Sequence, residues 1–326
     1  MTDRMLQFVT WRDRLMRWSR PLLHAEDALP VALVGGIAIG SFVWNAYAGL
    51  TWTPALPVFT LLLTTFAFFG IVAIFSTVFS NRVMVELATY YGLWASFPFF
   101  GVRLNYLAAT LDFPLQDALF ARADQAIGFD WLTWASIAWS HPTFINVLIV
   151  AYRSNIYQPL LLVVLFAVWG PRGRNRELLT ATIFACLITV AISAVLPSFG
   201  PNRAYGIHSE WDSVLLALRA GTHLPLHYVG IVTFPSFHAS MAVLFAAAMR
   251  GNVYRFAAAS LVNGLMLIAT VPIGYHYLVD LIAGCVIAVG ALYAARLTDR
   301  RRDVFGHSLN AVANARPLKP PIPDRS

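Results

Sequence analysis

The sequence predicts an all-α fold, a polytopic integral membrane helical bundle with about eight transmembrane helices. The amino-acid composition is the first observation that supports this prediction. Of the 326 residues, 58% are hydrophobic and only 12% are charged, whereas about a quarter of a soluble globular domain is charged. The aromatic content of 14% excludes a disordered chain. The two cysteines, Cys186 and Cys285, lie in apolar runs and are too few for a disulfide-stapled secreted domain.

The apolar windows are the second observation. A helix that crosses the hydrocarbon needs about 20 mostly apolar residues. Eight windows qualify: residues 30–50, 55–79, 84–107, 143–169, 178–198, 234–250, 254–274 and 276–295. The sixth is short, and the fourth is long and interrupted by Arg153. The absence of strand-like alternation argues against an outer-membrane barrel.

The basic residues predict the orientation of the bundle. With the N-terminus inside, 18 of the 23 basic residues fall on inner segments. The outer loops instead carry acids: Asp112, Asp117, Asp124, Asp130, Glu210 and Asp212. This positive-inside asymmetry predicts an even number of spans with both termini cytoplasmic. The net charge of +7 therefore reflects the membrane topology of the chain, and no nucleic-acid partner is expected.

Three stretches fall outside the predicted spans. Residues 1–29 carry apolar side chains at helical spacing beside arginines, which predicts a cytoplasmic amphipathic segment. Residues 113–140 are too polar to span, and Trp131 and Trp134 suit a helix at the outer interface. Residues 297–326, which end in a proline-rich stretch, are expected to form a disordered cytoplasmic tail.

Polar segments end or open three of the spans. They are residues 197–203 after the fifth span, 234–240 at the start of the sixth and 274–280 at the start of the eighth. By the predicted topology all three reach the outer face. Ionisable groups in or beside membrane spans are costly and are functional candidates by default. We therefore expect the three segments to form one site.

The third segment carries a histidine and a carboxylate at helical spacing. His276 and Asp280 are i, i+4, so a helix would place their side chains in contact on one face. A carboxylate beside an imidazole fixes its tautomer and raises its basicity, which suits a nucleophile or a general base.

The other two segments offer phosphate ligands and a proton donor. Pro235-Ser236 predicts a helix start, where the N–H groups and the dipole attract an anion. Ser236 adds a hydroxyl donor, and His238 in the first turn is a candidate proton donor. Gly200-Pro201 predicts a sharp turn that presents Asn202 and Arg203.

Other interpretations stay open at this point. His238, His276 and Asp280 are a conceivable metal site, but no H-E-x-x-H motif is present, and we expect no metal and no cofactor. Alternatively, His276 and Asp280 form a hydrogen bond with a purely structural role, and His238 is a core histidine whose hydrogen bonds are satisfied within the protein. Arg153, inside a span, is expected to pair with a carboxylate such as Asp280 or to bind phosphate. A transporter is a function of a different class, but paired inverted halves are not visible.

These segments resemble the type 2 phosphatidic acid phosphatase superfamily of membrane lipid phosphatases and phosphotransferases. Its second motif, P-S-G-H, is matched by residues 235–238, with Phe237 in place of glycine. Its third motif is matched by His276 and Asp280. Thr270 stands where that motif has an arginine.

The cationic first motif of the superfamily, K-x6-R-P, is absent, and Arg203 is a loose substitute. These departures are similar to the branch that contains inositol phosphorylceramide synthases and related inositolphosphotransferases. The similarity to that branch extends to residues 276–281, 151–154 and 124–131. The resemblance covers about residues 110–296.

The resemblance implies a phosphatidic acid phosphatase-like catalytic membrane domain over residues 111–296, with a six-helix core, preceded by transmembrane helices in residues 30–110. It implies a metal-independent enzyme in which His276 is the nucleophile, forms a phosphohistidine and is oriented by Asp280. His238 would protonate the leaving group. The implied phosphate ligands are Ser236 and Arg203, beside which Asn202 and Arg153 are candidates from their positions in the sequence.

The implied activity is transfer of a phospho-headgroup, such as phosphoinositol, from a phospholipid donor to a lipid acceptor or to water. A monoester carries nearly two negative charges and a diester one, so fewer cations favour a diester donor. The alternative within the superfamily is a lipid phosphate monoester phosphatase. The single lysine, Lys319, beside many arginines is typical of a high-GC bacterial genome. We expect a bacterial inner membrane location, with the site facing the periplasm.

Overall fold

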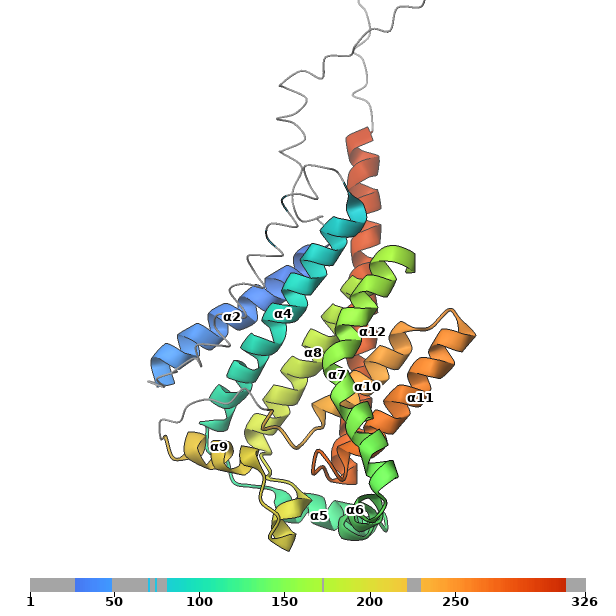
Figure 1. Cartoon of the computed structure of the whole chain (residues 1–326). Coiled ribbons are helices and arrows are strands. Elements are labelled where there is room, and N and C mark those ends of the chain that lie inside the picture. Colours follow the sequence, from blue (N-terminus) through green and yellow to red (C-terminus); the bar gives the residue numbers. More distant parts are fainter. Residues whose placement is uncertain are drawn as a thin grey trace, which may run out of the picture.

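The computed structural model describes residues 27–48, 70, 74, 81–171, 173–221 and 230–314, with side chains up to residue 300, and all regular structure in these ranges is helical (Figure 1). The helices are α2 (Ala28–Ala48), α4 (Arg82–Ala109), α5 (Asp117–Ala126), α6 (Trp131–Ser140), α7 (Pro142–Trp169), α8 (Arg174–Val195), η2 (a 3-10 helix, Pro201–Tyr205), α9 (Glu210–Arg219), α10 (Phe237–Ala248), α11 (Val253–Thr270) and α12 (Leu278–Asn314).

Five of the described helices are long and apolar enough to cross a membrane: α2, α7, α8, α11 and α12. α4 has 28 residues but also carries Glu86 and Arg103, and α10 is apolar but has only 12 residues. Seven of the eight predicted windows thus coincide with helices. The window 55–79 lies almost entirely outside the described residues, as do residues 1–26 of the predicted amphipathic segment. The protein is an all-helical, polytopic membrane protein.

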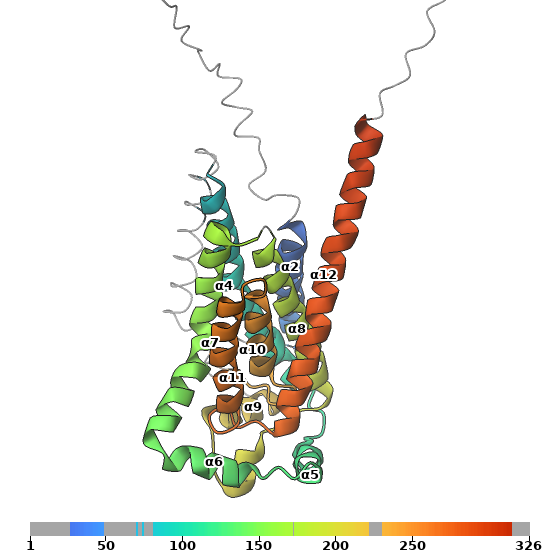
Figure 2. The same ribbon diagram turned by 90° about the vertical axis from the view of Figure 1, so that its right-hand side faces the viewer.

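α8 lies at the centre of the bundle. It contacts α4, α10 and α12, and α12 packs in turn against α10. α11 contacts both α10 and α7, and α2 packs against α4 (Figures 1 and 2). The outer helices expose large apolar side chains, among them Val150, Leu261 and Val286, each about two-thirds exposed or more. A helix satisfies its own backbone hydrogen bonds, so such faces suit lipid contact.

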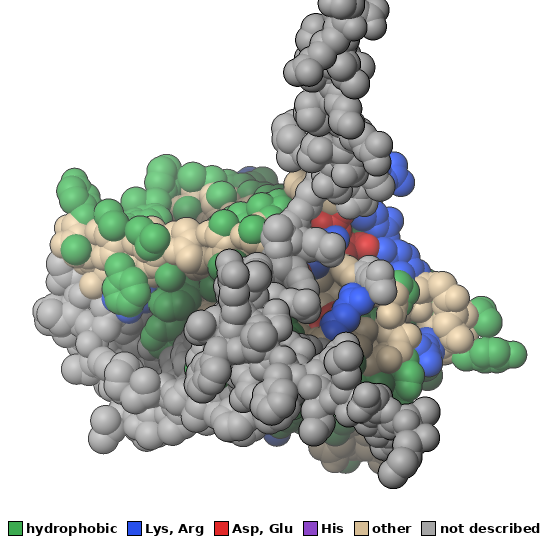
Figure 3. Space-filling view, turned by 90° about the horizontal axis from the view of Figure 1, so that it is seen from above, with side chains coloured by type: hydrophobic (Ala, Val, Ile, Leu, Met, Phe, Trp, Pro, Cys, Tyr) green, Lys and Arg blue, Asp and Glu red, His purple; other side chains and the backbone are tan. Residues whose placement is uncertain are grey.

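The two ends of the bundle differ. α5, α6 and α9 lie across one end, and α12 projects from the other (Figure 2). At the end from which α12 projects, basic side chains gather beside acidic ones (Figure 3). Glu177 of α8 pairs there with Arg250 and with Nε of Arg296 at 3.1 Å. Arg176 pairs with Asp299 at 2.9 Å. These ion pairs tie α8 to α12 and to the end of α10.

Two expectations are wrong in part. Residues 297–314 continue α12 instead of forming a disordered tail. This stretch is free of proline, which first appears at Pro317, so nothing in it breaks the helix. Residues 315–326 lie outside the described residues. Trp131 opens helix α6, but its side chain does not face outward as expected: it is only 3% exposed, and its indole N–H donates to the carbonyl of Val271 at 3.0 Å.

Glu177 is expected to be a main stabilising group at this end of the bundle. Its carboxylate is 12% exposed and shared by two arginines, so Glu177→Gln leaves both cations without a counter-charge. We expect the free energy of unfolding to fall by about 2–3 kcal/mol. Thermal unfolding in detergent measures this. Glu210→Gln on the exposed side of α9 is the control, and equal effects of the two variants would contradict the prediction.

Candidate functional site

The three polar segments meet at the end of the bundle where α5, α6 and α9 lie. The hydroxyl of Thr233 donates to the carbonyl of Ser198 at 3.1 Å, which joins the first segment to the residue just before the second. The backbone N–H of Ser236 donates to the carbonyl of Asp280 at 3.0 Å, which joins the second to the third. Gly200, at φ +107°, lies so close to the Tyr275 carbonyl that a Cβ there would clash.

His276 contacts Asp280, but not as two residues of one helix. α12 begins at Leu278, so His276 lies in the preceding loop and Asp280 in the first turn. Asp280 Oδ2 accepts from the Tyr277 N–H at 2.9 Å and lies 3.2 Å from Nδ1 of His276. The expected contact therefore forms, with a different local geometry. His276 is 3% exposed and Asp280 is completely buried.

The carboxylate fixes the tautomer of His276. Nδ1 carries the proton that faces Asp280, so Nε2 keeps its lone pair. Nε2 lies 3.5 Å from the hydroxyl oxygen of Ser236. Burial, together with the nearby His238, lowers the pKa of His276 to about 3, although a hydrogen bond with the backbone of Thr233 acts in the opposite direction. The imidazole is consequently neutral and able to act as a nucleophile at physiological pH.

Ser236 is the N-cap of α10. Its Oγ accepts from the N–H of Ala239 at 3.2 Å, so the predicted helix start is correct. His238, in the first turn, has its ring centroid 6.5 Å from that of His276, with the rings nearly edge to face. Both histidines thus lie at the N-terminal end of one short helix.

Tyr152 is a neighbour that the sequence did not single out. Its ring stacks on His238, with centroids 4.5 Å apart and planes 19° apart. One aromatic residue among many in an apolar span gives no signal of such a contact. Arg153, the next residue, is exposed on α7 and forms no ion pair with Asp280. The expected pairing of these two residues is wrong, because Asp280 is buried beneath His276 instead.

The turn after α8 places its two predicted phosphate ligands differently. Asn202 is completely buried and donates to the carbonyl of Ile207 at 2.7 Å, so it stabilises the turn and is not presented outward. The guanidinium of Arg203 lies 3.8 Å from the centroid of the Phe199 ring. Its Nη1 is buried and has no hydrogen-bond partner in the described part of the chain. Arg203 thus retains a donor for an anion.

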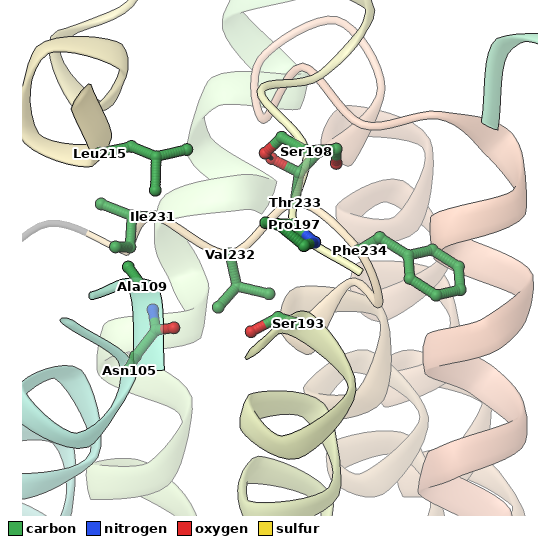
Figure 4. A pocket seen from close by; sticks show the side chains of 10 residues that line it. All are labelled: Asn105, Ala109, Ser193, Pro197, Ser198, Leu215, Ile231, Val232, Thr233 and Phe234. Atoms are coloured by element: carbon green, nitrogen blue, oxygen red, sulfur yellow. Dashed lines mark hydrogen bonds between the residues drawn. The ribbon is translucent and has the colours of Figure 1, made fainter. Parts of the chain in front are cut away.

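A small cavity lies beside these segments (Figure 4). Its volume is about 20 Å³, which is room for one water molecule. Asn105 of α4 and Ser193 of α8 line it together with residues 231–234. The hydroxyl of Ser198, also in its wall, has no hydrogen-bond partner among the described residues, so the cavity has the polar lining that a buried water needs.

The parts assembled here suit nucleophilic catalysis at an anionic group: a neutral imidazole with a carboxylate behind it, a second imidazole and a helix N-terminus. The described residues contain no group of three or more His, Cys, Asp or Glu that could hold a metal. A family model described as the PAP2 superfamily matches residues 118–294, which is more than half of the chain. The chain therefore belongs to the PAP2 superfamily.

Membership of this superfamily supports a function of the lipid phosphatase or phosphotransferase type. The match includes all three polar segments and also covers α5 from its second residue onward. Comparisons with curated proteins and with solved structures gave no match. The finer assignment of donor and acceptor therefore has to come from the chemistry of the site.

Gly284 of α12 is expected to permit the close approach of α12 to the start of α10. A Cβ at Gly284 would clash with the carbonyl of Ser236 and lie 2.9 Å from Cβ of Ala239. Gly284→Ala should therefore push α12 away from α10 and lower the free energy of unfolding by about 1–3 kcal/mol. Thermal unfolding tests this, with Gly290→Ala as the control, because nothing lies within 4 Å of a Cβ at Gly290. If both variants have the melting temperature of the wild type, the prediction is wrong, because α10 and α12 then have room for the added methyl group.

Proposed function

We propose that this protein is a membrane enzyme that transfers the phospho-headgroup of a phospholipid to an acceptor hydroxyl or to water through a phosphohistidine. One observation carries the proposal. Asp280 holds the Nδ1 side of His276, so that Nε2 faces Ser236 at the N-terminus of α10. A phosphorus atom bound at this N-terminus would lie in front of a lone pair.

In the proposed first step, Nε2 of His276 attacks the phosphorus and forms the P–N bond. The negative charge of the bound phosphate favours the protonated form of His238. The P–O bond to the diacylglycerol oxygen breaks, and His238 gives its proton to that oxygen. Asp280 stabilises the positive charge that develops on the imidazole of His276, as a buried carboxylate does for a catalytic histidine. The products of the step are a diacylglycerol and a phospho-headgroup bound to His276.

In the proposed second step, the hydroxyl of the acceptor lipid or of water attacks the same phosphorus. His238, now neutral, takes the hydroxyl proton, the P–N bond breaks, and the electron pair returns to Nε2. Both steps thus use the same two histidines in reversed roles. The stacking of Tyr152 on His238 supports a fixed position for the proton carrier.

The charge of the segments that meet here favours a phosphodiester donor. Residues 197–203, 234–240 and 274–280 contain a single arginine, Arg203. A diester brings one negative charge, which one guanidinium and the N–H groups of a helix N-terminus can match. A monoester brings nearly two. A phospholipid with an esterified headgroup, such as phosphatidylinositol, is therefore the better donor.

We also propose that the site faces the outer side of a bacterial inner membrane, with both termini cytoplasmic. α8, α10 and α12 each run between the site end and the end that carries Arg174, Arg250 and Arg296. A gathering of arginines at one end of a membrane bundle favours the cytoplasmic side for that end.

A comparison of two lipids tests the donor. We expect the purified protein in mixed micelles to release the headgroup from phosphatidylinositol at least about tenfold faster than inorganic phosphate from phosphatidic acid. The reason is that an unmatched second charge costs more than the roughly 1.4 kcal/mol that a tenfold rate difference represents. Mass spectrometry of both products gives the rates. Turnover of phosphatidic acid alone would contradict the proposed donor.

Removal of the nucleophile tests the mechanism. His276→Ala should lower headgroup release by about 1000-fold or more, because no other group can form the intermediate. The control is His208→Ala. His208 and Asp212 are also i, i+4, with their nitrogen and oxygen 3.7 Å apart, but the His208 side chain is 71% exposed. Alkaline quenching of the wild type should reveal a phospho-headgroup on the peptide that contains His276. Unchanged turnover by His276→Ala would remove this mechanism.

A further inference from the structure

α5 is a short helix that lies across the site end of the bundle and contacts α12. It carries two carboxylates, Asp117 and Asp124, which are seven residues apart and therefore lie on the same face. Asp124 is only 4% exposed, and Asp117 is half-buried. A carboxylate removed from water needs hydrogen-bond donors, and both of these find them on the segments of the candidate site.

Asp124 caps the start of α12. Its Oδ2 accepts from the N–H of Leu278 at 2.9 Å, and its Oδ1 accepts from the N–H of Val279 at 3.0 Å. The first N–H groups of a helix have no partner within the helix, so a carboxylate there stabilises the turn. Leu278 and Val279 lie between His276 and Asp280 in the chain. Asp124 therefore fixes the backbone that holds the pair together.

Asp117 binds the turn after α8. Its Oδ1 accepts from the N–H of Gly200 at 3.0 Å, and both of its oxygens accept from the N–H of Phe199, at 3.1 and 3.2 Å. Oδ1 also accepts from the hydroxyl of Tyr277 at 3.3 Å. One carboxylate thus holds the turn that leads to Arg203 and the residue that follows His276.

We infer that Asp117 and Asp124 are positioning residues, which make α5 a clamp that sets the phosphate-binding turn against the nucleophile. This inference rests on the proposed function, because it assigns the two carboxylates to the placement of His276 and Arg203. Neither carboxylate touches the reacting atoms. Each acts through backbone N–H groups, and the two together span both sides of the site.

Asp130 offers a matched control for a purely structural cap. It is exposed at the N-cap of α6, where its Oδ1 accepts from the N–H of Leu132 at 3.1 Å and its Oδ2 from the hydroxyl of Thr133. These hydrogen bonds stay within α6 and reach none of the three segments. Asp130→Ala therefore removes a helix cap from the same region without loosening the clamp.

The experiment measures kcat and KM for phosphatidylinositol in mixed micelles, together with the melting temperature. We expect Asp124→Ala to lower kcat at least about 30-fold with KM within about threefold, because a nucleophile displaced by an ångström loses much of its rate. Asp117→Ala should raise KM about fivefold or more, because the turn that carries Arg203 loosens. Asp130→Ala should leave both constants within about twofold.

Conservative variants keep the test decisive if an alanine variant fails to fold. Asp124→Asn retains one acceptor oxygen, so it should fold and recover part of kcat. The inference is overturned if the folded variants of Asp124 and Asp117, to alanine and to asparagine, all have the same kcat and KM as Asp130→Ala. His276→Ala separates this outcome from failure of the proposed function. If that variant stays active, the nucleophile is wrong; if it is inactive while the α5 variants are normal, only the clamp is wrong.

Discussion

The buried contact between Asp280 and His276 is the interaction on which the rest of the site depends. A carboxylate with no exposure to water needs hydrogen-bond donors. Oδ2 of Asp280 has two, the His276 imidazole and the N–H of Tyr277, whereas Oδ1 has no partner among the described residues. Each donor comes from the loop just before α12. The conformation of that loop is therefore coupled to the protonation state and the orientation of the imidazole.

The spacing of residues alone cannot reveal this coupling. His208 with Asp212 and His276 with Asp280 have the same i, i+4 spacing, and in both pairs the histidine precedes the helix of its partner. In the first pair the histidine is exposed to water although Asp212 is buried, and such a contact contributes little, whereas both members of the second pair are buried. The apolar spans around residues 234–240 and 274–280 predict that water is excluded there. They therefore indicate that the second pair is the buried one.

Most of the fold could be predicted from apolar runs and charge placement, because lipid permits few structures other than helices. The histidines, Asp280 and Ser236 could be singled out because polar groups in apolar runs are unusual. Other features had no such signal. The burial of Asn202, the exposure of Arg153 and the contacts of Asp117 and Asp124 depend on tertiary geometry. In particular, a carboxylate that accepts from the backbone of a segment about 150 residues away leaves no periodic pattern.

The site end illustrates why a membrane enzyme needs such long-range contacts. Turns and helix starts at the membrane boundary carry N–H groups that lipid cannot satisfy. In a soluble protein, water would serve many of them. Here Asp117 satisfies two of these N–H groups and Asp124 two more. The bundle of long helices supplies a rigid frame, and the carboxylates of α5 connect the irregular segments that the frame leaves open. The hydrogen bonds that satisfy these N–H groups therefore also limit how far the turn after α8 and His276 can move apart.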